Sequence, residues 1–208
     1  MDYKPLIDKT IESLINQFHR KPHNFFNEHE FHAYCYHRFY RQKEFSKQYT
    51  TLDGRKTNIL KPEYPSIKRF SRERLEVLRK EGSRGHYDLA FLNPKFIQNF
   101  KYYVVRNKNI TYSHDGPDNL IAVIEFKYVT SHDCNFNHEV KYDLLKLGVA
   151  NEAKNKYFLM FVNAPGKERD YFKEVTIPVD VNIRYVRIWE ENGKKMFKDI
   201  DKTKVKGD

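Results

Sequence analysis

Residues 121–130 read IAVIEFKYVT, and the interpretation of the whole chain starts from this stretch. Apolar side chains dominate it, which is typical of a β-strand buried on both faces. Side chains alternate across a strand, so Glu125 and Lys127 share one face while Phe126 and Tyr128 share the other. A carboxylate and an ammonium cost desolvation energy in such a strand, and costly charges cluster at functional sites. The charged pair in this strand therefore predicts a functional site.

A second strand is predicted upstream, in RGHYDLAFL at residues 84–92. If it pairs antiparallel with the first strand and Leu92 lies opposite Ile121, then Asp88 lies opposite Glu125. Directly opposed residues have Cβ atoms about 4.5–5.5 Å apart. Two carboxylates this close repel each other unless a cation lies between them or one is protonated, and Mg²⁺ suits such a pair. The register is critical, because a slip of one residue moves every side chain to the other face.

The remaining patterns predict a single α/β or α+β domain, with a central mixed sheet flanked by helices. Its parts are an N-terminal helix at 5–19, a core over about 25–165 and a C-terminal helix and hairpin at 167–200. Within these parts, apolar periodicity and turn signals predict further elements. They are helices over 28–44, 71–82 and 138–154, an edge strand in 59–66, a buried strand in 157–165, a helix over 167–175 and a hairpin over 183–200.

The start of the second helix carries a candidate acid. Asn27 is a good N-cap, Glu30 stands at the capping-box position, and Phe26 with Phe31 fits a hydrophobic staple. Glu28 heads the apolar stripe of this helix, three residues before Phe31. Its place in the first turn is equally explained by the helix dipole.

Bulk composition narrows the class of partner. The 38 Lys and Arg residues exceed the 28 Asp and Glu residues, giving a formal charge of +10. This balance favours polyanions such as nucleic acid, or an anionic membrane surface. We find no apolar run long enough to span a membrane and no signal-peptide pattern at the N-terminus. Two cysteines do not make a secreted disulfide framework, so we expect a cytoplasmic protein.

The order of these features resembles the PD-(D/E)XK nuclease superfamily, whose core is restriction-endonuclease-like. The resemblance is carried by NEHEF, RGHYDLAF, IAVIEFKY and EVKYDLLKL, and it spans about residues 25–165. A helix acid, an isolated strand aspartate and a Glu-x-Lys strand follow one another as in that family. The chain departs from the family in three respects: Tyr87 replaces a proline before Asp88, the gap from Asp88 to Glu125 is long, and either Glu28 or Glu30 could be the helix acid.

The resemblance implies a nuclease that hydrolyses phosphodiester bonds, with DNA endonuclease activity as the expectation. Asp88 and Glu125 would bind Mg²⁺ or Mn²⁺, with the Phe126 carbonyl as a further ligand. Lys127 would orient or help deprotonate the attacking water and stabilise charge on the phosphate. A lysine suits this role because burial readily lowers its pKa. Glu28 would hold a metal-bound water or a second ion.

Three further residues are candidates for contact with nucleic-acid phosphates. Arg84 and His86 share the face of Asp88, and Lys146 lies on the helix after the Glu-x-Lys strand. Two of them have plainer interpretations: such a histidine is more often a satisfied polar residue, and Asp143 and Lys146 are spaced for a helical ion pair. Aromatic and basic residues in 100–112 would suit base stacking or a packed flap.

The sequence leaves two other functions open: a non-catalytic nucleic-acid-binding protein on the same scaffold, and an interaction protein that uses its basic surface alone. DNA versus RNA and endonuclease versus exonuclease also stay open. So does a homodimer, which cleavage of a duplex at two active sites would favour.

Overall fold

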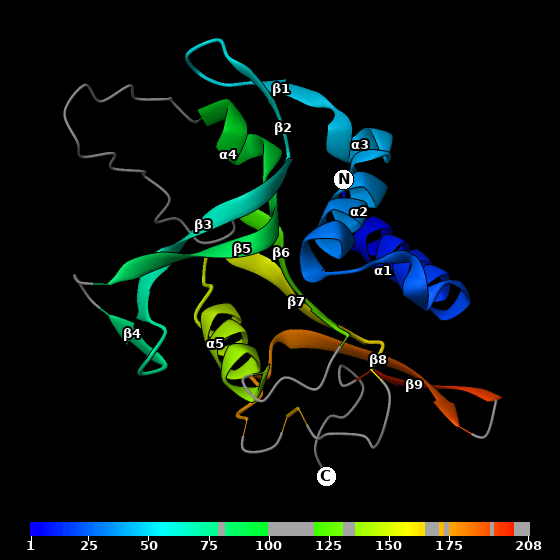
Figure 1. Ribbon diagram of the computed structural model, residues 1–208. Helices are drawn as coiled ribbons and strands as arrows, with labels where there is room; N and C mark the ends of the chain where they lie inside the picture. Colours follow the sequence, from blue (N-terminus) through cyan, green and yellow to red (C-terminus); the bar gives the residue numbers. More distant parts are fainter. Residues whose placement is uncertain are drawn as a thin grey trace.

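A seven-stranded mixed sheet forms the centre of the molecule (Figure 1). The structure is a computed structural model that describes residues 1–78, 82–99, 119–130, 136–164, 171–172, 175–191 and 194–201. Strand order across the sheet is β4-β3-β5-β6-β7-β8-β9. Its strands are β3 Leu60–Ser71, β4 Glu76–Leu78, β5 Ser83–Leu92, β6 Leu120–Val129, β7 Ala153–Val162, β8 Val181–Glu191 and β9 Lys194–Asp201. β1 Gln48–Thr50 and β2 Lys56–Asn58 form a separate hairpin. The expected mixed sheet flanked by helices is confirmed.

The β5–β6 pair determines where the charged residues lie. The strands are antiparallel, and Leu89 pairs with Ile124, which is the predicted register. A bulge near the far end gives Leu92 the partner Leu120 in place of the expected Ile121. The ladder ends at the pair of Leu89 with Ile124, so Asp88 and Glu125 follow where the two strands separate. On its other side β6 runs parallel to β7.

Helices cover both faces of the sheet (Figure 1). On one face, Phe31 contacts Phe126 and Phe18 contacts Tyr128, with ring centroids 6.0 and 6.2 Å apart. Because side chains alternate, Glu125 and Lys127 face the opposite side, which α5 covers. The helices are α1 Lys4–Arg20, the short 3₁₀ helix η1 Pro22–Asn24, α2 Glu28–Tyr40, α3 Lys43–Ser46, α4 Pro94–Asn99 and α5 Phe136–Gly148.

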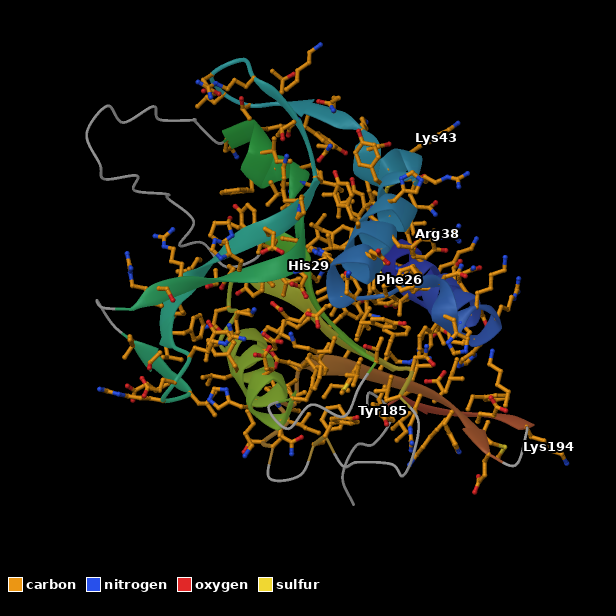
Figure 2. The ribbon with its side chains drawn as sticks, in the orientation of Figure 1. Phe26, His29, Arg38, Lys43, Tyr185 and Lys194 are labelled. Carbon is orange, nitrogen blue, oxygen red and sulfur yellow. The ribbon has the colours of Figure 1, made fainter. Side chains whose placement is uncertain are left out.

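The start of α2 confirms the predicted cap and corrects the predicted staple. Asn27 Oδ1 accepts a hydrogen bond from the Glu30 N–H at 2.9 Å, and the Glu30 carboxylate accepts one from the Phe26 N–H. The prediction that Phe26 packs on Phe31 is wrong. Phe25 takes that place, with ring centroids 5.2 Å apart, because it also fits against other core rings of this face. Phe26 is 83% exposed at the surface (Figure 2).

The helix predicted over 71–82 is wrong. A turn at 72–75 is followed by β4, whose Leu78 pairs with Arg69 of β3. Tertiary pairing with β3 overrides the local helical spacing, a common outcome for short segments. Likewise α5 ends at Gly148 and not at residue 154, because Ala153 already begins β7.

The strand predicted in 59–66 is longer than expected. β3 runs from Leu60 to Ser71 and pairs with β5 along most of its length. Its prolines, Pro62 and Pro65, lie where β4 does not reach, because β4 pairs only with Arg69–Ser71. Among the described residues, that side of β3 has no strand partner at the prolines, which is where a sheet tolerates the missing N–H.

The C-terminal hairpin is confirmed, since β8 and β9 pair antiparallel. The aromatic segment 100–112 lies outside the described residues, as does most of the helix expected over 167–175. No helix in the described part of the chain combines the length and apolar character that crossing a bilayer requires.

Candidate functional site

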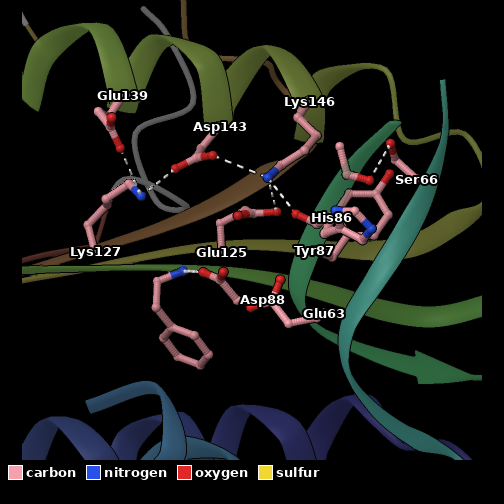
Figure 3. A network of polar contacts seen from close by, with 12 residues as sticks. Glu63, Ser66, His86, Tyr87, Asp88, Glu125, Lys127, Glu139, Asp143 and Lys146 are labelled. Atoms are coloured by element: carbon pink, nitrogen blue, oxygen red, sulfur yellow. Dashed lines mark hydrogen bonds and ion pairs between the residues drawn. The ribbon is translucent and has the colours of Figure 1, made fainter. Parts of the chain in front are cut away.

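A cluster of buried charges lies between β6 and α5 (Figure 3). Glu125 and Lys127 project from β6 and are 1% and 7% exposed. They meet Glu139, Asp143 and Lys146, which the spacing of four and then three residues places on one side of α5. The cluster thus adds a group of charges to the contact between β6 and α5, beside the buried apolar residues Val140, Leu144 and Leu147 of α5.

Lys127 lies among three carboxylates. Its Nζ is 3.0 Å from Asp143 Oδ2, 3.3 Å from Glu28 Oε1 and 3.7 Å from Glu139 Oε2. Glu28 is the first residue of α2 and comes from the opposite side of the sheet to α5. The helix acid that reaches the site is therefore Glu28, while Glu30 serves the cap.

Lys146 forms the second half of the cluster. Its Nζ is 2.8 Å from Glu125 Oε1 and 3.2 Å from Asp143 Oδ1, and it donates a hydrogen bond to the His86 carbonyl at 2.7 Å. Asp143 consequently bridges Lys127 and Lys146. The expected helical pair of Asp143 and Lys146 is present, but both residues also reach β6.

The carboxylates keep both lysines charged. Burial alone would lower the pKa of Lys127, but Asp143 and Glu28 more than offset it, and the pKa is raised. Lys146 behaves in the same way, with Glu125 and Asp143 outweighing burial. The expectation that burial lowers the pKa of Lys127 is therefore wrong in this structure. Asp143 shows the converse: burial opposes its charge, yet the two lysines lower its pKa.

Asp88 lies beside the backbone of β6, at the point where β5 separates from it (Figure 3). Its Oδ2 accepts a hydrogen bond from the Phe126 N–H at 2.6 Å. Burial raises the pKa of Asp88 to about 6, although this hydrogen bond and the nearby lysines oppose the rise. Burial also raises the pKa of Glu125, with Lys146 opposing and Asp88 adding to the effect. The two acids interact, although the Glu125 carboxylate is turned toward Lys146.

His32 of α2 and Glu63 of β3 converge on Asp88. A ring nitrogen of His32 and one carboxylate oxygen from each acid lie within 4.8 Å of one another. The His32 Nε2 is 2.8 Å from the Asp88 carbonyl oxygen, which can only accept, so Nε2 carries the hydrogen. The other ring nitrogen, Nδ1, faces Glu63 Oε1 at 3.8 Å, which is an ion pair when the ring is protonated. A ring anchored by one nitrogen on a carbonyl, with the other nitrogen facing carboxylates, is also the arrangement of metal-ligating histidines.

Glu63 is held in an unusual backbone conformation. Its φ is 47°, in the left-handed region that non-glycine residues rarely adopt. It lies opposite Asp88, because Pro62 pairs with Leu89 and Tyr64 pairs with Tyr87 on either side. Such strained residues cluster at functional sites, where the surrounding structure compensates for them.

Known proteins offer no guide to this cluster. No protein-family model, curated protein or solved structure matches the chain. Its chemistry has to follow from its own side chains.

The structure gathers four of the predicted residues, Glu28, Asp88, Glu125 and Lys127, into one region. Their catalytic and metal-binding roles stay predictions, as does that of the Phe126 carbonyl. The residues predicted to contact phosphate differ in position. His86 is exposed and Arg84 is partly exposed, whereas Lys146 is buried in the cluster.

Sequence reasoning missed His32 and Glu63 and placed Asp143 only in a helical pair. His32 lies four residues after Glu28, so helical spacing puts both on one face of α2 and would have identified it. Glu63 carries no comparable signal, because it reaches the site only through the register of β3 against β5.

Proposed function

We propose that this protein is a metal-dependent nuclease that hydrolyses phosphodiester bonds, with DNA as its expected substrate, on a restriction-endonuclease-like core. The observation that carries the proposal is the convergence of His32, Glu63 and Asp88, which come from three separate elements. Lys127 is close enough for its charge to oppose the raised pKa of Asp88. A net charge of +10 suits a polyanionic substrate.

The donor set fits a divalent cation. Carboxylate oxygens suit Mg²⁺ and Mn²⁺, and the ring nitrogen of His32 favours a transition ion such as Mn²⁺. Glu125 supplies another carboxylate nearby. When bound, such an ion would polarise a phosphoryl oxygen and lower the pKa of a water molecule.

Lys127 acts in this proposal as a fixed positive charge. Its raised pKa keeps it an ammonium at neutral pH, so it is poorly suited to remove a proton from water. An ammonium whose charge acts on Asp88 can instead stabilise negative charge that develops on the phosphate. Asp143 and Glu28 orient it, at 3.0 and 3.3 Å.

Plasmid nicking and cleavage of labelled single strands test the proposal. We expect cleavage with Mn²⁺ or Mg²⁺ and none with EDTA. Asp88→Asn and Lys127→Met should each reduce the rate by about 100-fold or more, as losses of metal binding or of electrostatic stabilisation do. Asp180→Asn is the control, because this acid pairs with Lys156 away from the cluster. Cleavage that persists in EDTA, or in both site variants, would contradict the proposal.

The same assays address the non-catalytic alternative, which the basic charge also supports. Fluorescence anisotropy in EDTA measures nucleic-acid binding without cleavage. A nuclease keeps its affinity in the Asp88→Asn variant while it loses cleavage. A binding protein shows affinity but no cleavage with any divalent ion, and that result would favour the alternative.

A further inference from the structure

We infer that Lys146 is a positioning residue: it serves as a resident counter-ion that holds Glu125 toward α5, and a divalent cation competes with it for this carboxylate. The inference rests on the metal site of the proposed function. It concerns how that site is loaded, and it does not depend on which nucleic acid is cleaved.

Glu125 is a buried acid whose acceptor capacity is not fully used. Its Oε1 is 2.8 Å from Lys146 Nζ, and the residue is 1% exposed. Among the described residues, Lys146 is the cation paired with this oxygen, so the charge of Glu125 is balanced through this single contact. A buried carboxylate oxygen of this kind gains free energy from a further cationic ligand.

Lys146 is anchored independently of Glu125. Its Nζ donates to the His86 carbonyl at 2.7 Å and lies 3.2 Å from Asp143 Oδ1. If the Glu125 carboxylate turned away, Lys146 would keep one hydrogen bond and one ion pair. Glu125 is therefore the movable member of the pair, and Lys146 is the fixed one.

The backbone of β5 makes room for the Lys146 side chain. A Cβ at Gly85 would lie 2.8 Å from Lys146 Cδ, well inside normal contact distance, and 3.3 Å from Ser66 Oγ. The absence of a side chain at Gly85 thus allows the alkyl chain of Lys146 to reach Glu125. Gly85→Ala would displace that chain while leaving its charge in the protein.

The charge of Lys146 also acts on the metal group. It favours the ionised form of Asp88, so it lies within electrostatic range of the carboxylate that His32 and Glu63 approach. An ammonium at this position repels an incoming divalent cation and occupies one of its candidate ligands. Removing the ammonium removes both effects.

The test is Mn²⁺ binding, measured by isothermal titration calorimetry and by the Mn²⁺-induced shift in melting temperature, without nucleic acid. Lys146→Met should bind Mn²⁺ about tenfold or more tightly than the wild type, since a like charge near the site is removed. Gly85→Ala should shift affinity in the same direction. Lys156→Met is the matched control, because Lys156 is also buried and lies 2.6 Å from a carboxylate, that of Asp180. This variant should bind Mn²⁺ with the same affinity as the wild type.

A double variant isolates the pair. In a Glu125→Gln background, Lys146→Met should lose most of its gain in affinity, because the carboxylate for which the cations compete is absent. Retention of the full gain would overturn the assigned role of Glu125.

The outcomes separate this inference from the proposed function. If the wild type does not bind Mn²⁺, the metal site and the inference fail together. If the wild type binds Mn²⁺ and Lys146→Met binds it equally or more weakly, the inference fails alone. If Lys146→Met does not fold, the Mn²⁺ affinities of Lys146→Gln and Gly85→Ala are measured instead. An affinity equal to that of the wild type in both variants overturns the inference.

Discussion

On one face of β6, Phe126 and Tyr128 pack against aromatic rings of α1 and α2, whereas on the other face Glu125 and Lys127 meet the charged side chains of α5. All four residues are buried. The two faces therefore differ in chemistry and not in exposure to water.

The two faces of this one strand are therefore expected to contribute differently to stability and to function. Apolar burial stabilises a fold roughly in proportion to the area removed from water. Buried ion pairs lose much of their attraction to desolvation and are often replaceable by apolar residues without loss of stability. The aromatic face explains why α1 and α2 stay on the sheet, and Val140, Leu144 and Leu147 do the same for α5. The charges buried beside them are what needs a functional reason.

The largest effect on stability is expected on the aromatic face. Phe126→Ala removes a fully buried ring beside Phe31 and should lower the free energy of unfolding by about 3–5 kcal/mol. Urea denaturation followed by circular dichroism measures it. A loss below about 1 kcal/mol would mean that this face does not hold the layers together as the packing implies.

A smaller loss is expected from Asp143→Asn on the charged face. The substitution removes the acid shared by Lys127 and Lys146 but leaves each lysine another carboxylate, so we expect a loss of about 2–3 kcal/mol. Replacing the linked group together, as Asp143→Leu, Lys146→Met and Glu125→Leu, should recover most of it, because no buried carboxylate is then left without its lysine. Urea denaturation serves again, and a triple variant less stable than Asp143→Asn would refute the comparison.

The smallest effect is a pH dependence. The pKa of Asp88 in the folded protein is about 6, against an ordinary value of 3.8, so the folded state binds this proton more tightly than the unfolded chain. The contribution of Asp88 to stability therefore falls as pH rises between about 4 and 6. The contribution of Glu125, whose pKa is also raised, falls with rising pH in the same way. The pKa of Asp143 is lowered, so its contribution to stability is lost as pH falls.

Urea midpoints at pH 4, 5, 6 and 7, measured in EDTA, check this dependence. Wild type should lose stability relative to Asp88→Asn over that range, because asparagine carries no proton to lose. Parallel curves for the two proteins would show that Asp88 has its ordinary pKa.

Several features of the fold followed from local patterns. α1 and α2 were predicted to within a few residues because apolar spacing along them is strong, and alternation identified β5 and β6. Their register was a supposition that holds at Leu89 and Ile124 but not at Leu92, which pairs with Leu120. The segment 71–82 was misassigned because its charges fit a helix as well as a hairpin, and only pairing with β3 distinguishes them.

Alternation along the strand backbone places Glu125 and Lys127 on one face of β6 opposite Phe126, whatever the rest of the fold. The partners of those charges depend on how distant elements pack together. Lys146 turns toward Glu125, Glu28 reaches Lys127 across the sheet, and His32 with Glu63 meets Asp88. Ion-pair energies and pKa shifts depend on distance and burial between elements far apart in the chain, and neither quantity is encoded in residue spacing.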